Sequence, residues 1–453
     1  MNISKDLEAT FDTPFSDVMP HLGEAFPEQE IRSALESVKK KTERWRALPN
    51  EAAIWLVIGM ALLRDRSIEM VASQMNILWG AAKTVSSAAI VKARNRLGFE
   101  PMRRLFLYTA EAWGSASLEE HLWRGLKVLG IDGTCIRIPD SLKNDREFGR
   151  PSGGPSNDAA GYPVVRAVAL LALRTRLLLE VAFDGYAISE KALARQLWEK
   201  LPGNSLTILD KGFVDYGVFS EIITGGVDRH FLCRAKKNMS YRVVEILADG
   251  DELVEVKMSA SQRRENPNLP THLILRRTRY QIKGFQPQAL ISSLLDPGTF
   301  PGEEIAKMYH ERWELEITYD EIKTHTLDRE EALRSQDPDK IRQELWGLFV
   351  AYNLVRQHIV RFARQHDISP HRISYRNTLH IVREICCAAA LGAGSIRNLM
   401  KSLDERIALM ILPARRSERR YPRHVKIKMS NYPKNKGRYG NQSRPDLPAP
   451  DFK

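Results

Sequence analysis

The chain has 453 residues, 43% of them hydrophobic, which is enough for two to four structural units and excludes a mostly disordered protein. It carries 68 Lys and Arg against 56 Asp and Glu, a formal net charge of +12. This basic balance favours a polyanionic partner.

The cysteines and the longest apolar run bear on the compartment. Cys135, Cys233, Cys386 and Cys387 have no zinc-ligand spacing and predict small buried thiols of a reducing compartment. The first residues lack the basic and then apolar pattern of a signal peptide. The longest clean apolar run, residues 52–63, is too short to span a bilayer. We therefore expect a soluble, cytoplasmic and nucleoid-associated protein.

Residues 1–29 form an acidic segment, and residues 30–120 are expected to form a helical N-terminal domain. In the second segment apolar residues recur at spacings of three and four, which predicts several amphipathic helices. Ser86 and Gly98 are suited to begin and end the last of them. The basic residues of that helix are Lys92, Arg94 and Arg96. They favour DNA binding, and a bundle that only packs on the main domain is the open alternative.

Residues 121–237 show a pattern of strands and helices. Residues 127–138 alternate in polarity, and two apolar runs, 164–173 and 176–186, predict a hairpin. A long loop dense in Gly, Pro, Ser and Asn is expected at 141–163. A helix, a fourth strand, a second helix and a fifth strand follow. This order predicts an α/β protein with a ribonuclease H-like mixed sheet flanked by helices.

The same core is expected to resume at 298–335, after a β-rich insertion at 238–297. Residues 336–413 predict further amphipathic helices, and residues 414–453 form a basic tail. Within the tail, residues 415–444 carry eleven Lys or Arg and one acid, which is typical of a phosphate-contacting arm. A solvated tail without a partner is the open alternative.

Two acids stand in or after predicted strands. Asp132 lies in the apolar strand VLGIDGT, where a carboxylate needs a partner or a metal ion because burying it alone is costly. Gly133 beside it allows a close approach to the backbone. Asp210 follows the fourth strand in TILDKGF, at a sheet edge where ligands usually bind. The two strands are neighbours in the predicted fold, so the carboxylates should face one another; a structural acid and a turn acid are the alternatives.

A third group of residues lies in YHERWELEITYDEIK. On an ideal helix Tyr309, Arg312, Glu316 and Lys323 lie within roughly 60° of one another. One helix face would then present a carboxylate with a guanidinium, an ammonium and a phenol, which suits a metal ion and phosphate oxygens. A solvated helix face is the alternative.

These motifs resemble those of a known family. The spacing Y-x2-R-x3-E-x6-K is similar to the signature around the third acid of DDE transposases of the insertion-sequence-four group. GIDGT and LDKGF resemble the motifs of the first and second acids of that group. RWRALPNEAAIWLVIGMALL resembles its N-terminal domain, and RRYPRHVKIKMSNYPKNK its basic C-terminal ending. The likeness covers about residues 30–438.

The resemblance implies a DNA transposase that binds transposon ends, cleaves them by Mg²⁺-dependent phosphodiester hydrolysis and joins the 3′-OH ends to target DNA. It implies that Asp132, Asp210 and Glu316 are catalytic ligands of two Mg²⁺ ions, with Mn²⁺ able to substitute. It further implies that Tyr309, Arg312 and Lys323 contact DNA near the cleaved end. The implied partners are inverted-repeat ends, target DNA and a second copy of the chain in a synaptic homodimer.

One family detail has no counterpart here. Some relatives hold a flipped base on a Trp of the β insertion, and this chain has no Trp between Trp198 and Trp313. Two other functions remain open: a ribonuclease H-like metal-dependent nuclease without strand transfer, and a catalytically silent, transposase-derived DNA-binding protein. Retention of all three acids argues against the silent protein.

Overall fold

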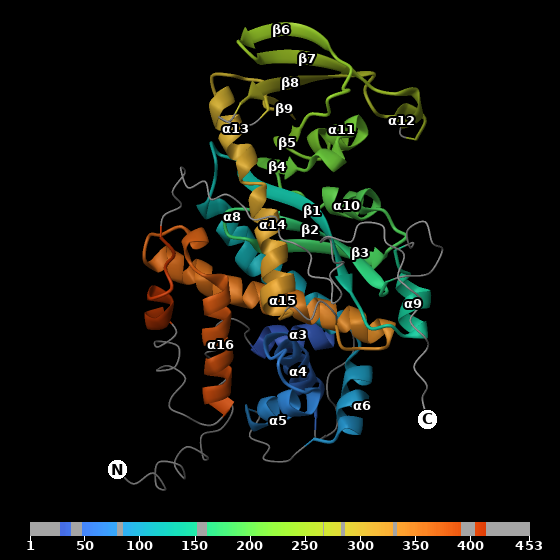
Figure 1. The fold of residues 1–453 in the computed structure, drawn as a ribbon, viewed down its shortest axis with the longest axis vertical. Coiled ribbons are helices and arrows are strands. Elements are labelled where there is room, and N and C mark those ends of the chain that lie inside the picture. The colour runs from blue at the N-terminus through green and yellow to red at the C-terminus, as the bar shows by residue number, and fades with distance from the viewer. Residues whose placement is uncertain are drawn as a thin grey trace, which may run out of the picture. The chain divides into compact units, whose positions relative to one another are not determined.

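The computed structural model describes most of the chain (Figure 1). The described residues are 28–37, 48–78, 85–151, 161–265, 267–281, 286–328, 333–390 and 404–413. Up to Leu412 they belong to one compact unit. The basic tail and nearly all of the acidic first segment lie outside the described residues.

This unit is built around a mixed sheet that has nine strands in the described part of the chain. The strand order is β3-β2-β1-β4-β5-β9-β8-β7-β6. Strand β1 is antiparallel to β2 and parallel to β4, and β4 is parallel to β5. The strands are β1 (Lys127–Arg137), β2 (Val164–Ala172), β3 (Leu177–Gly185), β4 (Ser205–Leu209), β5 (Arg229–Arg234), β6 (Arg242–Ala248), β7 (Asp251–Lys257), β8 (His272–Tyr280) and β9 (Gln288–Ser292).

The helices fall into three groups along the chain. Those before the sheet are α3 (Glu28–Glu36), α4 (Asn50–Leu62), α5 (Ile68–Leu78), α6 (Ser87–Leu97), α7 (Glu100–Thr109), the π-helix η2 (Ala110–Ser115) and α8 (Ala116–Glu120). Those between strands are α9 (Leu142–Phe148), α10 (Glu190–Trp198), the 3₁₀ turn η3 (Lys211–Phe213), α11 (Tyr216–Thr224) and α12 (Ala260–Glu265). Those after the sheet are α13 (Gly302–His310), α14 (Trp313–Asp320), the π-helix η4 (Glu321–Thr326), α15 (Pro338–Gln365), the 3₁₀ turn η5 (Pro370–Arg372) and α16 (Tyr375–Ala390).

Helices cover both faces of the sheet, and each face has its own apolar core. On one face α10 and α11 pack on the central strands, and the rings of Phe219 and Phe231 stack with centroids 3.9 Å apart. The central strands β2 and β4 are buried almost throughout, as expected for strands covered on both sides. The predicted mixed sheet flanked by helices is therefore confirmed.

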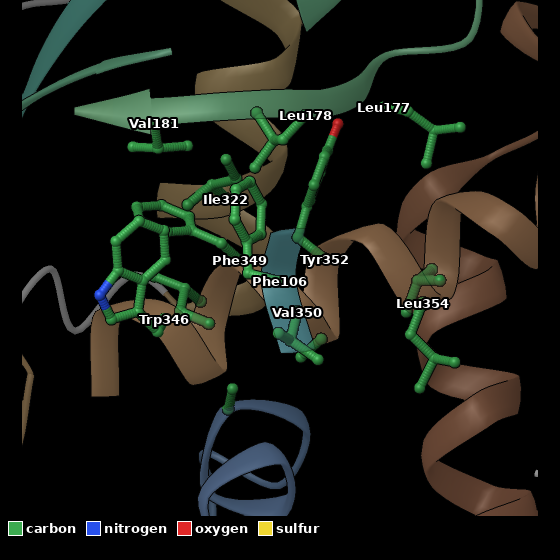
Figure 2. Packing of buried hydrophobic residues seen from close by; sticks show 14 of the residues in the cluster. Phe106, Leu177, Leu178, Val181, Ile322, Trp346, Phe349, Val350, Tyr352 and Leu354 are labelled. Atoms are coloured by element: carbon green, nitrogen blue, oxygen red, sulfur yellow. The ribbon is translucent and has the colours of Figure 1, made fainter. Parts of the chain in front are cut away.

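The second core is organised by helix α15. Figure 2 shows Trp346, Phe349 and Tyr352 of α15 grouped with Phe106 of α7 beneath Leu178 of β3. The ring centroids of Phe106 and Trp346 are 5.2 Å apart, and those of Phe106 and Phe349 are 6.1 Å apart. This cluster joins the N-terminal helices, the sheet and the long helix in one core.

Helix α4 packs directly on α15, and every one of its residues except Glu51 is buried. Gly347 permits this contact, because a Cβ there would lie 2.6 Å from Cγ1 of Val57. Helix α6 is tied to α15 by a buried ion pair in which Arg94 lies 3.3 Å from Glu344. Two of the basic side chains expected to face DNA thus point inward: Arg94 makes this pair, and Arg96 donates to Asn50 at 2.7 Å.

The β-rich segment continues the core sheet instead of forming a separate one. Strand β9 pairs with β5, with Leu232 opposite Ser292, and β8, β7 and β6 extend the sheet outward. Arg276 of β8 is fully buried and donates to Asp251 at 2.8 Å and to the carbonyl of Phe300 at 2.6 Å. These bonds fix the added strands to the turn that precedes α13.

The expected loop and two of the four cysteines differ from the sequence prediction. The loop expected at 141–163 contains helix α9, which Ser141 caps by accepting a hydrogen bond from the Asn144 N–H at 3.2 Å. The cysteines are all free; Cys233 and Cys386 are buried as expected, while Cys135 and Cys387 are half-buried. Among the described helices, none combines the length and apolar character needed to cross a membrane.

Candidate active site

Asp132 and Asp210 lie on the neighbouring strand lines of β1 and β4, where the pairing of these two strands ends. In the parallel pair β1–β4, the last paired residues are Ile131 and Leu209. Asp132 and Asp210 directly follow them in the chain. Asp210 also caps the turn η3 by accepting a hydrogen bond from the Gly212 N–H at 3.2 Å. The sequence expectation that these carboxylates would be neighbours agrees with this register.

Asp132 occupies an electrostatically unfavourable position. Burial raises the pKa of its carboxyl group to about 6, and repulsion from Glu190 and Asp210 acts in the same direction. A hydrogen bond from the Gly133 N–H, 2.8 Å from Oδ1, and the positive charge of Arg312 oppose the rise only in part. The site therefore has an excess of negative charge that a cation would offset.

Arg312 connects the first acid to the third. Its Nη2 donates to Oε1 of Glu316 at 2.6 Å, and its Nη1 lies 3.9 Å from Oδ2 of Asp132. Burial disfavours the guanidinium charge, but the hydrogen bond to Glu316 and the nearby acids outweigh burial and raise the pKa of Arg312. Glu316 and Asp132 thus face the same cationic side chain from α14 and β1.

The signature also contains Tyr309 and Lys323, which precede and follow Arg312 and Glu316 in the chain. Lys323, in the π-helix η4, donates from Nζ to Oγ1 of Thr134 on β1 at 3.4 Å. Tyr309, in α13, is only 7% exposed. Burial, and then the nearby Cys233 and Asp210, raise the pKa of its phenol well above the usual range. Tyr309 is therefore a protonated phenol and a poor nucleophile.

The signature does not lie on one straight helix as the ideal spacing suggested. Tight backbone bonds from Glu311 N–H to Met308 O and from Arg312 N–H to Tyr309 O separate α13 from α14. A π-helix then begins at Glu321, with the Leu327 N–H bonding five residues back to Ile322 O at 2.9 Å. Both irregularities change the rotation between signature residues, so the ideal 100° step fails over this segment.

Glu190 is a site residue that the sequence analysis did not identify. It opens helix α10, where Ser189 caps by accepting from the Ala192 N–H at 3.2 Å. Its carboxyl group lies against Gly133, where a Cβ would be 2.7 Å from Oε1 of Glu190. The sequence signal was available: an acid in the first turn of the helix that follows the predicted hairpin.

Tyr319 of α14 is a second residue that sequence reasoning missed. Its hydroxyl donates to the backbone carbonyl of Asp132 at 2.5 Å, and the buried phenol has a strongly raised pKa. This bond ties the helix of the third acid directly to the strand of the first.

The carboxylates suit a hard divalent cation, because Mg²⁺ prefers oxygen ligands. As the side chains stand, no three His, Cys, Asp or Glu residues in the described ranges lie close enough together to hold an ion. The donor chemistry and the negative charge around Asp132 nevertheless fit one. Asp132, Asp210 and Glu316 come from three different elements: β1, the cap of the turn η3, and α14.

Comparison with known proteins identifies the family of this chain. Residues 17–107 match the family model described as the N-terminal region of insertion element 4 transposases, and residues 123–354 match the transposase DDE domain. The Escherichia coli (strain K12) transposase InsG for insertion sequence element IS4 is 34% identical over 432 residues, which covers 94% of this chain and 96% of InsG. A piggyBac transposase synaptic complex with hairpin DNA aligns with 88% of this chain and 85% of its own, at 11% identity and a TM-score of 0.40.

The two family models and the InsG relative define a transposase with a DDE domain. The chain belongs to the insertion element 4 family of transposases. The family predicted from the motifs is thus confirmed. Membership implies the breakage and transfer of phosphodiester bonds in general, and DDE domains generally use divalent metal ions.

Proposed function

We propose that this transposase binds inverted-repeat transposon ends, cleaves them by Mg²⁺-dependent hydrolysis and joins the resulting 3′-OH ends to target DNA. Asp132, Asp210 and Glu316 hold the metal ions in this proposal. The observation that carries it is the bridge formed by Arg312, which contacts Glu316 at 2.6 Å and Asp132 at 3.9 Å. That bridge links Glu316 to Asp132 through one side chain, which supports a single site for the three acids.

Asp132, Asp210 and Glu316 would hold two Mg²⁺ ions, which would supply positive charge to polarise the scissile phosphate and stabilise the attacking and leaving oxygens. The chain supplies position and charge. The planar fork of Arg312 can grip a phosphate in two places, and Lys323 offers a point charge farther along the same helical segment. Tyr309 takes part as a hydroxyl donor to DNA and not as a nucleophile, because burial keeps its phenol protonated.

Glu190 belongs to the same site in this proposal. Its carboxyl group lies against Gly133, next to Asp132, and electrostatic repulsion links it to both Asp132 and Asp210. We assign it the role of a fourth carboxylate that faces the ions.

Joining two ends to a target requires both ends at once. The proposal therefore includes a homodimer that holds two transposon ends and the target DNA, with each copy supplying one set of acids.

The test uses the inverted repeats that flank the gene, a separate target duplex and purified full-length protein. Nicking at the repeat boundary in Mg²⁺, its loss in EDTA and the appearance of joined products support the proposal. Nicking without joined products would point to a nuclease, and binding without nicking would point to a silent DNA-binding protein. Either outcome would overturn the proposal.

A further inference from the structure

Four buried charged side chains form an ion-pair network that includes the α14–η4 segment, which also carries Glu316. They are Arg176, Glu314, Glu321 and Arg356, and each is less than 5% exposed. Nε of Arg176 donates to Glu314 at 2.7 Å and its Nη1 donates to Glu321 at 2.7 Å. Nε of Arg356 donates to the other oxygen of Glu321 at 3.1 Å. The two positive and two negative charges balance; we call this group the buried quartet.

The quartet joins three elements that are distant in sequence. Arg176 lies in the turn between β2 and β3, with a left-handed φ of 59°. Arg356 lies on α15, one turn after Tyr352, whose hydroxyl also donates to Glu321 at 3.0 Å. Figure 2 shows Tyr352 among the apolar side chains between α15 and β3. The carboxylates belong to α14 and η4, the segment that carries Glu316 and Lys323.

The quartet contacts the face of the α14–η4 segment that is turned away from the proposed site. Glu314 and Glu321 are seven residues apart, as are Glu316 and Lys323. Glu316 follows Glu314 by two residues within the α-helix α14, a rotation of about 200°. Lys323 likewise follows Glu321 by two residues within η4. Burial agrees: Glu314 is 3% exposed, whereas the side chain of Glu316 is 40% exposed.

Apolar contacts alone would fix the rotation and axial position of the α14–η4 segment less sharply. A helix packed by dispersion tolerates small slides and rotations, whereas a guanidinium bonded to carboxylates two turns apart fixes both rotation and axial position. Buried ion pairs are costly to desolvate and add little net stability compared with apolar side chains, so stability is a poor reason for the quartet. Positioning Glu316 and Lys323 is a better reason for the quartet, because misplacing a catalytic group by 1 Å can slow a reaction on the order of 100-fold.

We propose that Arg176 is a positioning residue that, through Glu314 and Glu321, sets the rotation of the α14–η4 segment and so aims Glu316 at Asp132. The proposal rests on the function assigned above to Glu316. Arg176 touches neither DNA nor metal in it and acts only through the segment.

The test compares two charge-neutral double variants of the full chain. Arg176→Met with Glu314→Gln removes one positive and one negative charge and leaves Arg356 paired with Glu321. Arg94→Met with Glu344→Gln removes the same charges from a buried pair that ties α6 to α15. The further hydrogen bonds of these two side chains within the described residues go to residues 334, 335, 340 and 343, outside the α14–η4 segment. Each variant is measured for thermal unfolding, binding to transposon ends, single-turnover cleavage at saturating DNA and the Mg²⁺ concentration that gives half the maximal rate.

We expect the Arg176/Glu314 variant to bind ends like the wild type, to cleave on the order of 100-fold more slowly and to need more Mg²⁺. The Arg94/Glu344 variant should keep the wild-type rate per folded molecule and the wild-type Mg²⁺ dependence. Arg176→Lys should not restore the rate, because one ammonium cannot bond two carboxylates in the same geometry.

A wild-type rate and Mg²⁺ dependence in the Arg176/Glu314 variant would overturn the proposal. So would an equal slowing in the Arg94/Glu344 variant, which would show a general effect of losing a buried pair. If the double variant does not fold, Glu314→Gln alone takes its place with the same expected and contrary results. A wild-type protein that fails to cleave would instead refute the proposed function.

Discussion

Asp132 is the residue at which the electrostatics of the site are most unbalanced. Burial, followed by the neighbouring carboxylates of Glu190 and Asp210, raises its pKa from 3.8 to about 6. Keeping this side chain ionised in the folded protein therefore costs free energy, which the Gly133 N–H and Arg312 offset in part and a bound cation would offset further.

This imbalance predicts how stability depends on pH without divalent cations. The pKa of Asp132 is higher in the folded protein than in the unfolded chain, so the protonated side chain favours folding. This contribution to stability is lost as pH rises from about 4 through about 6. Asp132→Asn should therefore stabilise the protein at pH 7.5, by at most about 3 kcal/mol, and much less at pH 4. Denaturant unfolding in EDTA measures this. Equal stabilisation at both pH values would show that the charge is not the cause.

Arg312 offers a second prediction at the scale of one side chain. Arg312→Ala should lower cleavage more than end binding, because it releases Glu316 and removes a fork suited to a phosphate. Arg312→Lys should not rescue cleavage, and Lys323→Ala should mainly weaken the complex with the cleaved end. Single-turnover cleavage and end binding are measured for all three. Wild-type behaviour of Arg312→Lys in both assays would make the planar fork irrelevant.

Glu190 gives a third prediction. Glu190→Gln should weaken the binding of Mn²⁺, followed by its electron paramagnetic resonance signal, while the melting temperature in EDTA stays the same or rises. Gly133→Ala should have a similar effect on metal binding, because the added methyl would meet the Glu190 carboxyl group. If Glu190 only supports the start of α10, the variant would lose thermal stability and keep its metal affinity.

At the scale of elements, the central strands and the flanking helices could be predicted because their patterns are local. The alternation in β1 and the apolar runs of β2 and β3 identify these strands directly. The neighbouring positions of Asp132 and Asp210 followed from the strand order. The fold therefore located two of the proposed acids before any contact was known.

The irregular elements could not be predicted in this way. The break before α14 and the π-helix η4 depend on contacts far away in sequence, such as the bond from Tyr319 to the Asp132 carbonyl and the grip of Arg176 on Glu321. A periodicity of 3.6 residues carries no information about such partners. Glu190 was missed for the same reason, since only the folded chain brings it to Gly133.

At the scale of the whole molecule, the sheet is larger than the sequence suggested. The pairing of β9 with β5 joins residues about sixty positions apart and makes the expected insertion a continuation of the core sheet. Inward-facing Arg94 and Arg96 leave Lys92 as the exposed basic side chain among the three expected on α6. Much of the excess positive charge lies in residues 415–444, outside the described residues.

This charge distribution predicts the effect of removing the tail. A chain that ends at Pro413 should bind all DNA more weakly and with a smaller dependence on salt, because phosphate contacts release counterions. Binding is measured to repeat ends and to unrelated DNA over a range of salt concentrations. An unchanged salt slope in the shortened chain would mean that the tail is only a solvated end.

The proposed function depends most on the three acids. Its most direct test is single-turnover cleavage of a transposon end in Mg²⁺ by Asp132→Asn, Asp210→Asn and Glu316→Gln, with the exposed Asp184→Asn of β3 as the matched control. We expect each of the three variants to lose nearly all cleavage while end binding persists, because each removes an oxygen ligand for the metal ions, and the control to behave like the wild type. A near-normal cleavage rate in any of the three would contradict the assignment of that acid.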